Sequence, residues 1–131
     1  MNQMVIHEVL AETQAGQLIF PEVVRRLLEV GVESYFCDLV TGAETFYLPN
    51  GKWYQEKMIL PLSPVAEEFS SSDVIAAIRG AQSDTIRYPE FIKHAAAAGV
   101  SAYWAFLTGR KVIYFGRKGQ FHVEDFPLQS P

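Results

Sequence analysis

Two segments of the chain carry apolar residues at helix spacing, and they begin at Pro21 and Pro89. The stripe recurs at i, i+1, i+4 and i+5, which is typical of a helix with one buried face. Its members are Val23, Val24, Leu27 and Leu28 in the first segment and Phe91, Ile92, Ala95 and Ala96 in the second. Proline suits the first helical position, and the glutamate that follows suits the positive end of the helix dipole. We expect Gly31 and Gly99 to end these helices in the left-handed conformation.

After each helix the apolar pattern changes to a period of two, which predicts strands. The matching faces carry Tyr35, Cys37 and Leu39 in one half and Tyr103, Ala105 and Leu107 in the other. Second strands are expected over 44–48 and 111–115, and third strands over 52–58 and 120–126. A further helix opens each half, over about 2–13 and about 73–82, the latter behind a Ser72 cap.

Short turns connect the predicted strands into antiparallel meanders. Thr41-Gly42 and Thr108-Gly109 reverse the chain after the first strand of each half. Pro49-Asn50-Gly51 is typical of a three-residue hairpin loop, because proline fits the first turn position and glycine the left-handed one. The cross-strand pairs that follow are Tyr47 with Trp53 and, in the later hairpin, Tyr114 with Phe121.

The two halves repeat one another at an offset of 68 residues. Residues 21–39 align on 89–107 without a gap, and six of these nineteen positions are identical, against roughly one in twenty by chance. The identical pairs are Pro21/Pro89, Glu22/Glu90, Gly31/Gly99, Val32/Val100, Tyr35/Tyr103 and Leu39/Leu107. A one-residue slip then aligns Thr41-Gly42 with Thr108-Gly109 and Tyr47 with Tyr114, before Gly51/Gly119 and Glu56/Glu124 return to the first offset.

This repeat predicts an α+β fold, a tandem duplication of a helix-helix-three-stranded antiparallel meander unit. Because three strands with one apolar face are marginal alone, we expect the two copies to pack with pseudo-twofold symmetry around one core. The expected organisation is a single domain, 1–131, with repeat 1 over about 2–60, a connector over about 61–71 and repeat 2 over about 72–127. Within the connector, Val65 and Phe69 are expected to pack.

Composition fits one folded domain that needs neither metal nor disulfides. The 131 residues are 49% hydrophobic, which is enough for a core of ordinary size. The one cysteine, Cys37, excludes an internal disulfide and suits a reducing compartment. We expect neither a membrane span nor a signal peptide, and therefore a cytoplasmic protein. A formal net charge of −4 disfavours nucleic acid as the partner.

Four blocks of sequence resemble a known family. They are FPEVVRRLLEVGVESYFCDL, FYLPNGKW, VIAAIRGAQ with IRYPEF, and GRKVIYFGRKGQFHVEDFP. Together they resemble the YbcV-like family of domains of unknown function (domain of unknown function 1398), whose members are sometimes labelled phage envelope protein. The resemblance extends from about Ile6 to Pro127. It implies a small bacterial or phage-associated α+β protein and supplies no catalytic or ligand residues.

The last hairpin carries the densest group of polar side chains. If Phe115 pairs with Gln120, Ile113 faces His122 and Lys111 faces Glu124 on one side of the sheet, while Val112, Tyr114, Phe121 and Val123 form core on the other.

This group is a candidate for catalysis. His122 and Glu124, with Arg110 or Arg117 nearby, would supply an acid, a base and an anion clamp. The competing interpretation is a solvated strand surface, which is favoured because Tyr54 stands at the His122 position of the first copy.

Other chemistry has less support. The three histidines are far apart in sequence and no metal-binding motif is present, so no metal and no cofactor are expected. Cys37 alternates with buried residues and is predicted to be inert packing. Asp38 is predicted to cap a loop.

Apolar rings on both sides of the predicted hairpins are the best functional clue. Four short helices are too few to cover both faces of about six strands, and an uncovered apolar patch usually marks a partner or a ligand groove. The candidate ligand or interface residues are Phe46, Tyr54, Ile113, Phe115 and Arg117.

Three functions therefore remain open. The favoured one is a non-enzymatic binding module whose second sheet face contacts a protein partner or a second copy of the chain. The others are a small hydrolase or transferase using His122 with Glu124, and a small-molecule binding protein with its site between the repeats.

Overall fold

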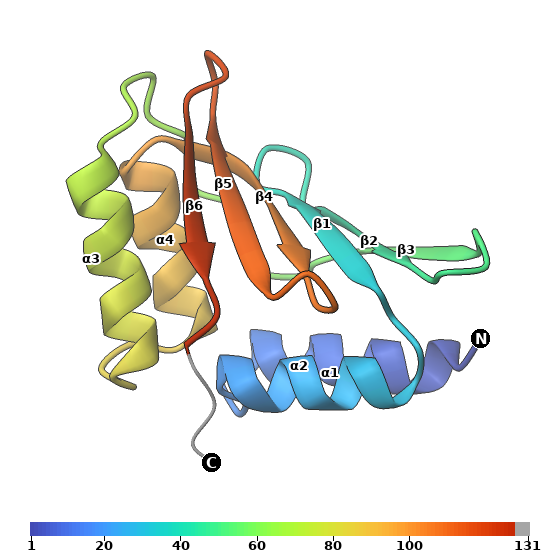
Figure 1. Cartoon of the computed structure of the whole chain (residues 1–131). Helices are drawn as coiled ribbons and strands as arrows, with labels where there is room; N and C mark the ends of the chain where they lie inside the picture. Colours follow the sequence, from blue (N-terminus) through green and yellow to red (C-terminus); the bar gives the residue numbers. More distant parts are fainter. Residues whose placement is uncertain (128–131) are drawn as a thin grey trace.

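The computed structural model describes residues 1–127, and residues 128–131 of the predicted domain lie outside the described part. Each repeat supplies two helices followed by three strands, in the predicted order (Figure 1). Repeat 1 consists of α1 (Gln3–Gln14), α2 (Phe20–Glu29), β1 (Ser34–Asp38), β2 (Ala43–Tyr47) and β3 (Trp53–Lys57). Repeat 2 consists of α3 (Ser71–Gln82), α4 (Tyr88–Ala97), β4 (Val100–Phe106), β5 (Lys111–Gly116) and β6 (Phe121–Asp125).

The six strands form one antiparallel sheet in the order β3-β2-β1-β4-β5-β6. The two meanders join where β1 pairs with β4. In that pair Tyr35 lies opposite Ala105 and Cys37 lies opposite Tyr103, and the repeat-equivalent residues Phe36 and Trp104 lie opposite each other. This reciprocal register relates the repeats by a pseudo-twofold axis through the centre of the sheet, and it confirms the predicted duplication.

All four helices pack against one face of the sheet, here called the inner face. The hydrophobic core contains residues from every helix and alternate residues from the central strands. The strand residues of this core are Tyr35, Cys37, Phe46, Tyr103, Ala105, Val112 and Tyr114. Intervening residues such as Phe36 and Trp104 point to the other, outer face and are only half-buried.

A single offset of 68 holds along both repeats, so the predicted slip is wrong. Each residue with positive φ in residues 1–127 has a positive-φ counterpart 68 positions away. The pairs are Gly16/Asp84, Gly31/Gly99, Gly42/Arg110 and Gly51/Gly119. Arg110, with φ of 59°, takes the position of Gly42. The repeat preserves a backbone conformation at this turn and not the Thr-Gly dipeptide on which the slip was based.

The predicted register of the last hairpin is also wrong, by one residue. Phe115 lies opposite Phe121, and Tyr114 lies opposite His122. The loop is the three residues 117–119, because the Gly116 N–H donates to the Gln120 carbonyl at 2.7 Å. A shift of one residue exchanges the two faces of a strand.

The shift moves four predicted orientations to the opposite face. His122 and Glu124 share the inner side with Tyr114 and Val112, the residues opposite them on β5. Phe121 and Val123, which were predicted to lie in the core, point outward, and Phe121 is 65% exposed.

The candidate interface residues do not share one surface. Phe46 is buried on the inner face, and Tyr54 lies opposite it on β3. Ile113 and Phe115 lie on the outer face, while Arg117 stands at the tip of the β5–β6 hairpin. The predicted common face is wrong because the slip made Ile113 the counterpart of Phe46, whereas Tyr114 holds that position.

Most local turn and cap predictions are confirmed. Tyr47 lies opposite Trp53, and the Asp38 carboxylate accepts hydrogen bonds from the backbone N–H groups of Val40 and Thr41 at 2.8 and 3.1 Å. The cap of α3 is Ser70 and not Ser72, since the Ser70 hydroxyl accepts from the third N–H beyond it. In the connector, Phe69 packs against the core as expected.

Candidate functional site

A cavity of about 260 Å³ lies between the helices and the inner face of the sheet, at the junction of the repeats. Residues from both repeats line it, many of them in pairs related by the offset of 68. These pairs are Leu10/Ile78, Thr13/Ala81, Leu18/Ile86, Ile19/Arg87, Phe20/Tyr88, Val23/Phe91, Tyr35/Tyr103, Glu44/Val112 and Phe46/Tyr114. The cavity is therefore placed on the pseudo-twofold axis, where two copies of one wall face each other.

The two walls differ in their polar groups. Glu44 stands on β2 where the second repeat has Val112, and Tyr88 begins α4 where the first repeat has Phe20. The Tyr88 hydroxyl donates to Glu44 Oε1 at 3.3 Å and lies 2.8 Å from the Tyr103 hydroxyl. Tyr103 can thus donate to Tyr88, which donates to Glu44, and this chain of hydroxyls ends at one buried carboxylate.

Glu44 is an acid without a counter-ion. Glu44 is 4% exposed, and none of the ion pairs within residues 1–127 includes it. Burial raises the pKa of Glu44 from 4.5 to about 7, although hydrogen bonds from Tyr88 and Cys37 oppose the rise. Near neutral pH this carboxyl group therefore exchanges between charged and uncharged forms.

The groups around Glu44 stay uncharged. Burial is the main cause that raises the pKa of Tyr35, of Tyr88 and of Tyr103 well above the usual value. Burial likewise raises the pKa of the Cys37 thiol, whose sulfur lies 3.7 Å from the Tyr88 hydroxyl. Cys37 is fully buried in the core and is not among the residues that line the cavity, so its thiol is a packing group.

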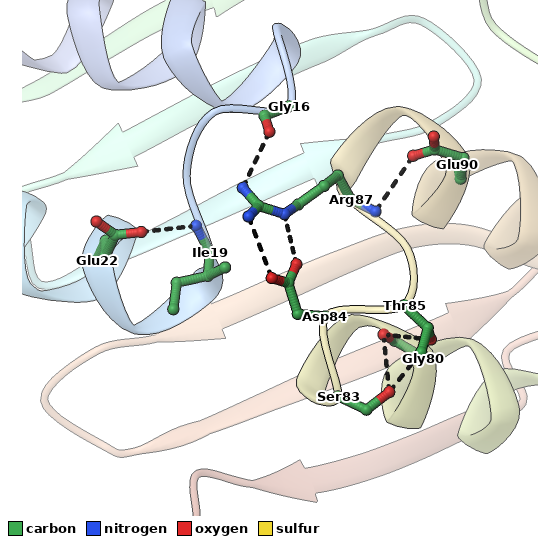
Figure 2. A network of polar contacts seen from close by, with 9 residues as sticks. All are labelled: Gly16, Ile19, Glu22, Gly80, Ser83, Asp84, Thr85, Arg87 and Glu90. Atoms are coloured by element: carbon green, nitrogen blue, oxygen red, sulfur yellow. Dashed lines mark hydrogen bonds and ion pairs between the residues drawn. The ribbon is translucent and has the colours of Figure 1, made fainter.

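Arg87 joins the two repeats at the rim of the cavity (Figure 2). Its guanidinium donates to the Gly16 carbonyl at 3.0 Å and to the Asp84 carboxylate at 2.5 and 3.2 Å. Gly16 and Asp84 are the equivalent left-handed residues of the two interhelical loops. Arg87 therefore holds together two loops that are 68 residues apart in sequence, and its charge is already paired.

The same figure shows one capping contact in both repeats. Glu22 accepts from the Ile19 N–H at 3.1 Å, and Glu90 accepts from the Arg87 N–H at 3.2 Å. This is the half of a capping box that satisfies the first free N–H of a helix, and it explains why the Pro-Glu pairs recur.

The structure places the catalytic candidates at the edge of the site. His122 Nε2 and Glu124 Oε1 are 3.4 Å apart on β6. Glu124 lines the cavity, whereas His122 is absent from its walls. The cation beside Glu124 is Arg79, at 2.8 Å. Although burial raises the pKa of Glu124, the hydrogen bonds from Arg79 and His122 and the Arg79 charge lower it overall.

The two candidate anion clamps lie elsewhere. The Arg110 guanidinium stacks on the Phe126 ring and donates to the Pro127 carbonyl at 3.3 Å. Arg117 donates to the Val65 carbonyl in the connector at 3.5 Å. The polar group predicted for the last hairpin is therefore divided among three places.

The sequence contained a signal for Glu44 that the slip concealed. With the slipped offset Glu44 aligns with Lys111, which suggests a solvated position in both copies. With the offset of 68, Glu44 aligns with Val112. It is also two residues from Phe46 in the same strand, which places both side chains on the buried face. A core position that holds a carboxylate in one repeat and a valine in the other indicates a site that is present in only one repeat.

Comparison with known proteins gives a family but no activity. The family model described as "Protein of unknown function (DUF1398)" matches residues 3–125. The chain belongs to this family. The match confirms the resemblance found in the sequence and covers both repeats of this DUF1398 member. No curated protein sequence matches the chain. Within residues 1–127, all helices are too short or too polar to cross a membrane.

Proposed function

We propose that this protein binds a small molecule in the cavity between its two repeats. The observation that supports the proposal is the cavity itself, a space of about 260 Å³ on the pseudo-twofold axis with walls from both repeats. An engineered cavity of about 150 Å³ holds benzene, so this one has room for a somewhat larger molecule with one or two rings.

The chemistry of the walls also supports a binding site. Ligand pockets are mostly apolar, with a few polar groups that fix orientation. Here the walls are mainly aliphatic and aromatic, and the polar groups at the floor are Glu44 and its neighbouring tyrosine hydroxyls. An enzyme using His122 has less support, because the cavity walls do not include that side chain.

A cavity-filling variant tests the proposal. Ala81 lines the cavity from α3, so Ala81→Trp should occupy the space. We expect indole and naphthalene, used as neutral aromatic probes, to raise the melting temperature of the wild type but not of the variant. A probe at a hundred times its dissociation constant stabilises by about 2.7 kcal/mol, which a thermal-shift assay resolves.

The matched control is Ala11→Trp, an exposed alanine on α1, the repeat-equivalent helix. This variant should respond to the probes as the wild type does. If no aromatic probe, neutral or charged, shifts the melting temperature up to its solubility limit, the cavity is not a binding site. Equal shifts in Ala81→Trp and the wild type would place binding elsewhere.

The outer face supports a second candidate, contact with a second copy of the chain. Trp53 and Phe121 are repeat-equivalent, and they are 62% and 65% exposed. The half-buried rings of Tyr47, Phe36 and Trp104 lie between these two edges on the same face, and a contiguous apolar surface is typical of an interface. Light scattering should give the mass of a dimer for the wild type and of a monomer for Phe121→Asp; a wild type that stays monomeric at high concentration would exclude this interface.

A further inference from the structure

We propose that the ligand of the inter-repeat cavity is an organic cation, whose ammonium group pairs with the Glu44 carboxylate while its apolar part lies among the aromatic rings. This inference rests on the proposed function and names its ligand class. It follows from three features of the cavity, which are an unpaired acid, a wall of aromatic rings and a set of hydroxyl groups already oriented toward the acid.

The first feature is the lack of a counter-ion at Glu44. Of the other acids that line the cavity, Glu124 has Arg79 at 2.8 Å and Asp84 has Arg87, while Asp125 is exposed to solvent. Glu44 instead accepts a hydrogen bond from the neutral hydroxyl group of Tyr88. An unpaired buried carboxylate is costly, and a positive group brought by a ligand removes that cost.

The second feature is the aromatic wall beside the acid. The Tyr35 ring lies 5.3 Å from the Phe46 ring and 6.2 Å from the Tyr103 ring, and the Tyr103 ring lies 5.8 Å from the Tyr114 ring. All four line the cavity with Glu44. Aromatic faces attract cations most strongly where water is excluded, so this wall favours the same charge as the carboxylate does.

The third feature disfavours an anionic ligand. The Tyr103 and Tyr88 hydroxyls form a chain that ends at Glu44, so their hydrogens are directed toward the acid. At the rim, the Arg87 guanidinium is held by Asp84 and the Gly16 carbonyl. The floor of the cavity therefore presents an acceptor.

Cation binding at this site is coupled to a proton. The titratable groups that face Glu44 are Tyr35 and Cys37 of β1, Glu56 of β3, Tyr103 of β4 and Tyr88 of α4. The thiol and the tyrosines stay neutral and Glu56 has its own partner in His7, so we expect Glu44 to be the group whose ionisation changes. A permanent cation should bind the ionised form, and below pH 7 its binding should release about one proton per ligand.

Two probes of nearly the same shape test the proposal. Benzyltrimethylammonium carries a permanent charge, and neopentylbenzene has carbon in place of its nitrogen. By calorimetry at pH 8.5 we expect the cation to bind at least about tenfold more tightly, the effect of a desolvated cation–π contact together with the ion pair. At pH 6, titrations in buffers of different ionisation enthalpy should show release of about one proton. Phenylacetate should bind more weakly than either probe.

Variants assign the preference to Glu44. Glu44→Gln should keep the neutral probe but lose the preference for the cation and the proton release. Glu56→Gln removes a neighbouring carboxylate outside the cavity wall and should keep both. Circular dichroism verifies that each variant is folded, and the wild-type pH dependence tests the proposal without any variant.

The outcomes separate this inference from the proposed function. If the neutral probe binds as tightly as the cation, and Ala81→Trp abolishes both, the cavity binds ligands but the charge assignment is wrong. A preference for phenylacetate, or a cation preference that persists in Glu44→Gln, overturns it equally. If neither probe binds and indole and naphthalene also fail, both proposals fall.

Discussion

Glu44→Gln should raise the free energy of unfolding by about 3 kcal/mol at pH 8.5 and change it little at pH 4. In the folded wild type, burial raises the pKa of Glu44 from 4.5 to about 7. Below pH 4.5 both the folded and unfolded chains hold the proton. Between pH 4.5 and 7 the unfolded chain releases it first, so stability falls as pH rises through this range. Because glutamine does not titrate, the free energy of unfolding of the variant does not fall over this range.

Urea unfolding followed by tryptophan fluorescence from pH 4 to pH 9 measures the effect. The difference between variant and wild type should grow through the range and then level off above pH 7. Glu29→Gln, at an exposed position on α2, is the control, and its curve should follow the wild type. Parallel pH profiles for Glu44→Gln and the wild type would show that Glu44 ionises normally. A function explains why a destabilising acid is present, because binding sites often reduce stability.

Gly99→Ala should destabilise the protein far more than Gly31→Ala, although the two glycines are repeat-equivalent. Both have positive φ, 85° at Gly31 and 95° at Gly99, which costs an alanine roughly 1–2 kcal/mol. A Cβ on Gly31 meets nothing within 4 Å, whereas one on Gly99 would overlap the Glu68 carbonyl oxygen and lie 2.8 Å from Phe69 Cα. Only the second variant must displace backbone.

The cause is the connector, which passes against repeat 2 at Gly99, whereas no segment of residues 1–127 takes the equivalent place at Gly31 in repeat 1. The Ala66 N–H donates to the Ala96 carbonyl at 3.0 Å, and the Ser70 N–H donates to the Ala98 carbonyl at 2.9 Å. Chemical unfolding should show a loss of roughly 1–2 kcal/mol for Gly31→Ala and a several-fold larger loss, or failure to fold, for Gly99→Ala. Equal losses would contradict the close packing of the connector on Gly99.

The fold was predictable because two signals agreed. The helix-spaced stripes and the period-two strands gave the elements, and the repeat gave their arrangement. The register of the later hairpin was not predictable from identities, because Arg110 adopts the left-handed conformation that Gly42 holds in the first repeat. Matching Thr-Gly with Thr-Gly therefore shifted the strand by one residue and exchanged its faces.

The site was harder to predict, for a related reason. His122, Glu124 and Arg110 were selected because they are close in sequence, but Glu44, Tyr88 and Tyr103 are brought together by the packing of one repeat on the other. Single-sequence patterns do not contain that packing. The contrast between Glu44 and Val112 did contain part of it, once the correct offset was applied.

Joining the two units in one chain has a consequence for ligand orientation. In a dimer of identical single repeats, a cavity on the twofold axis would carry two acids or none, and a bound molecule would have two equal poses. Covalent linkage lets one half hold glutamate while the other holds valine. A ligand with one charged and one apolar end would then bind in the cavity in a single orientation.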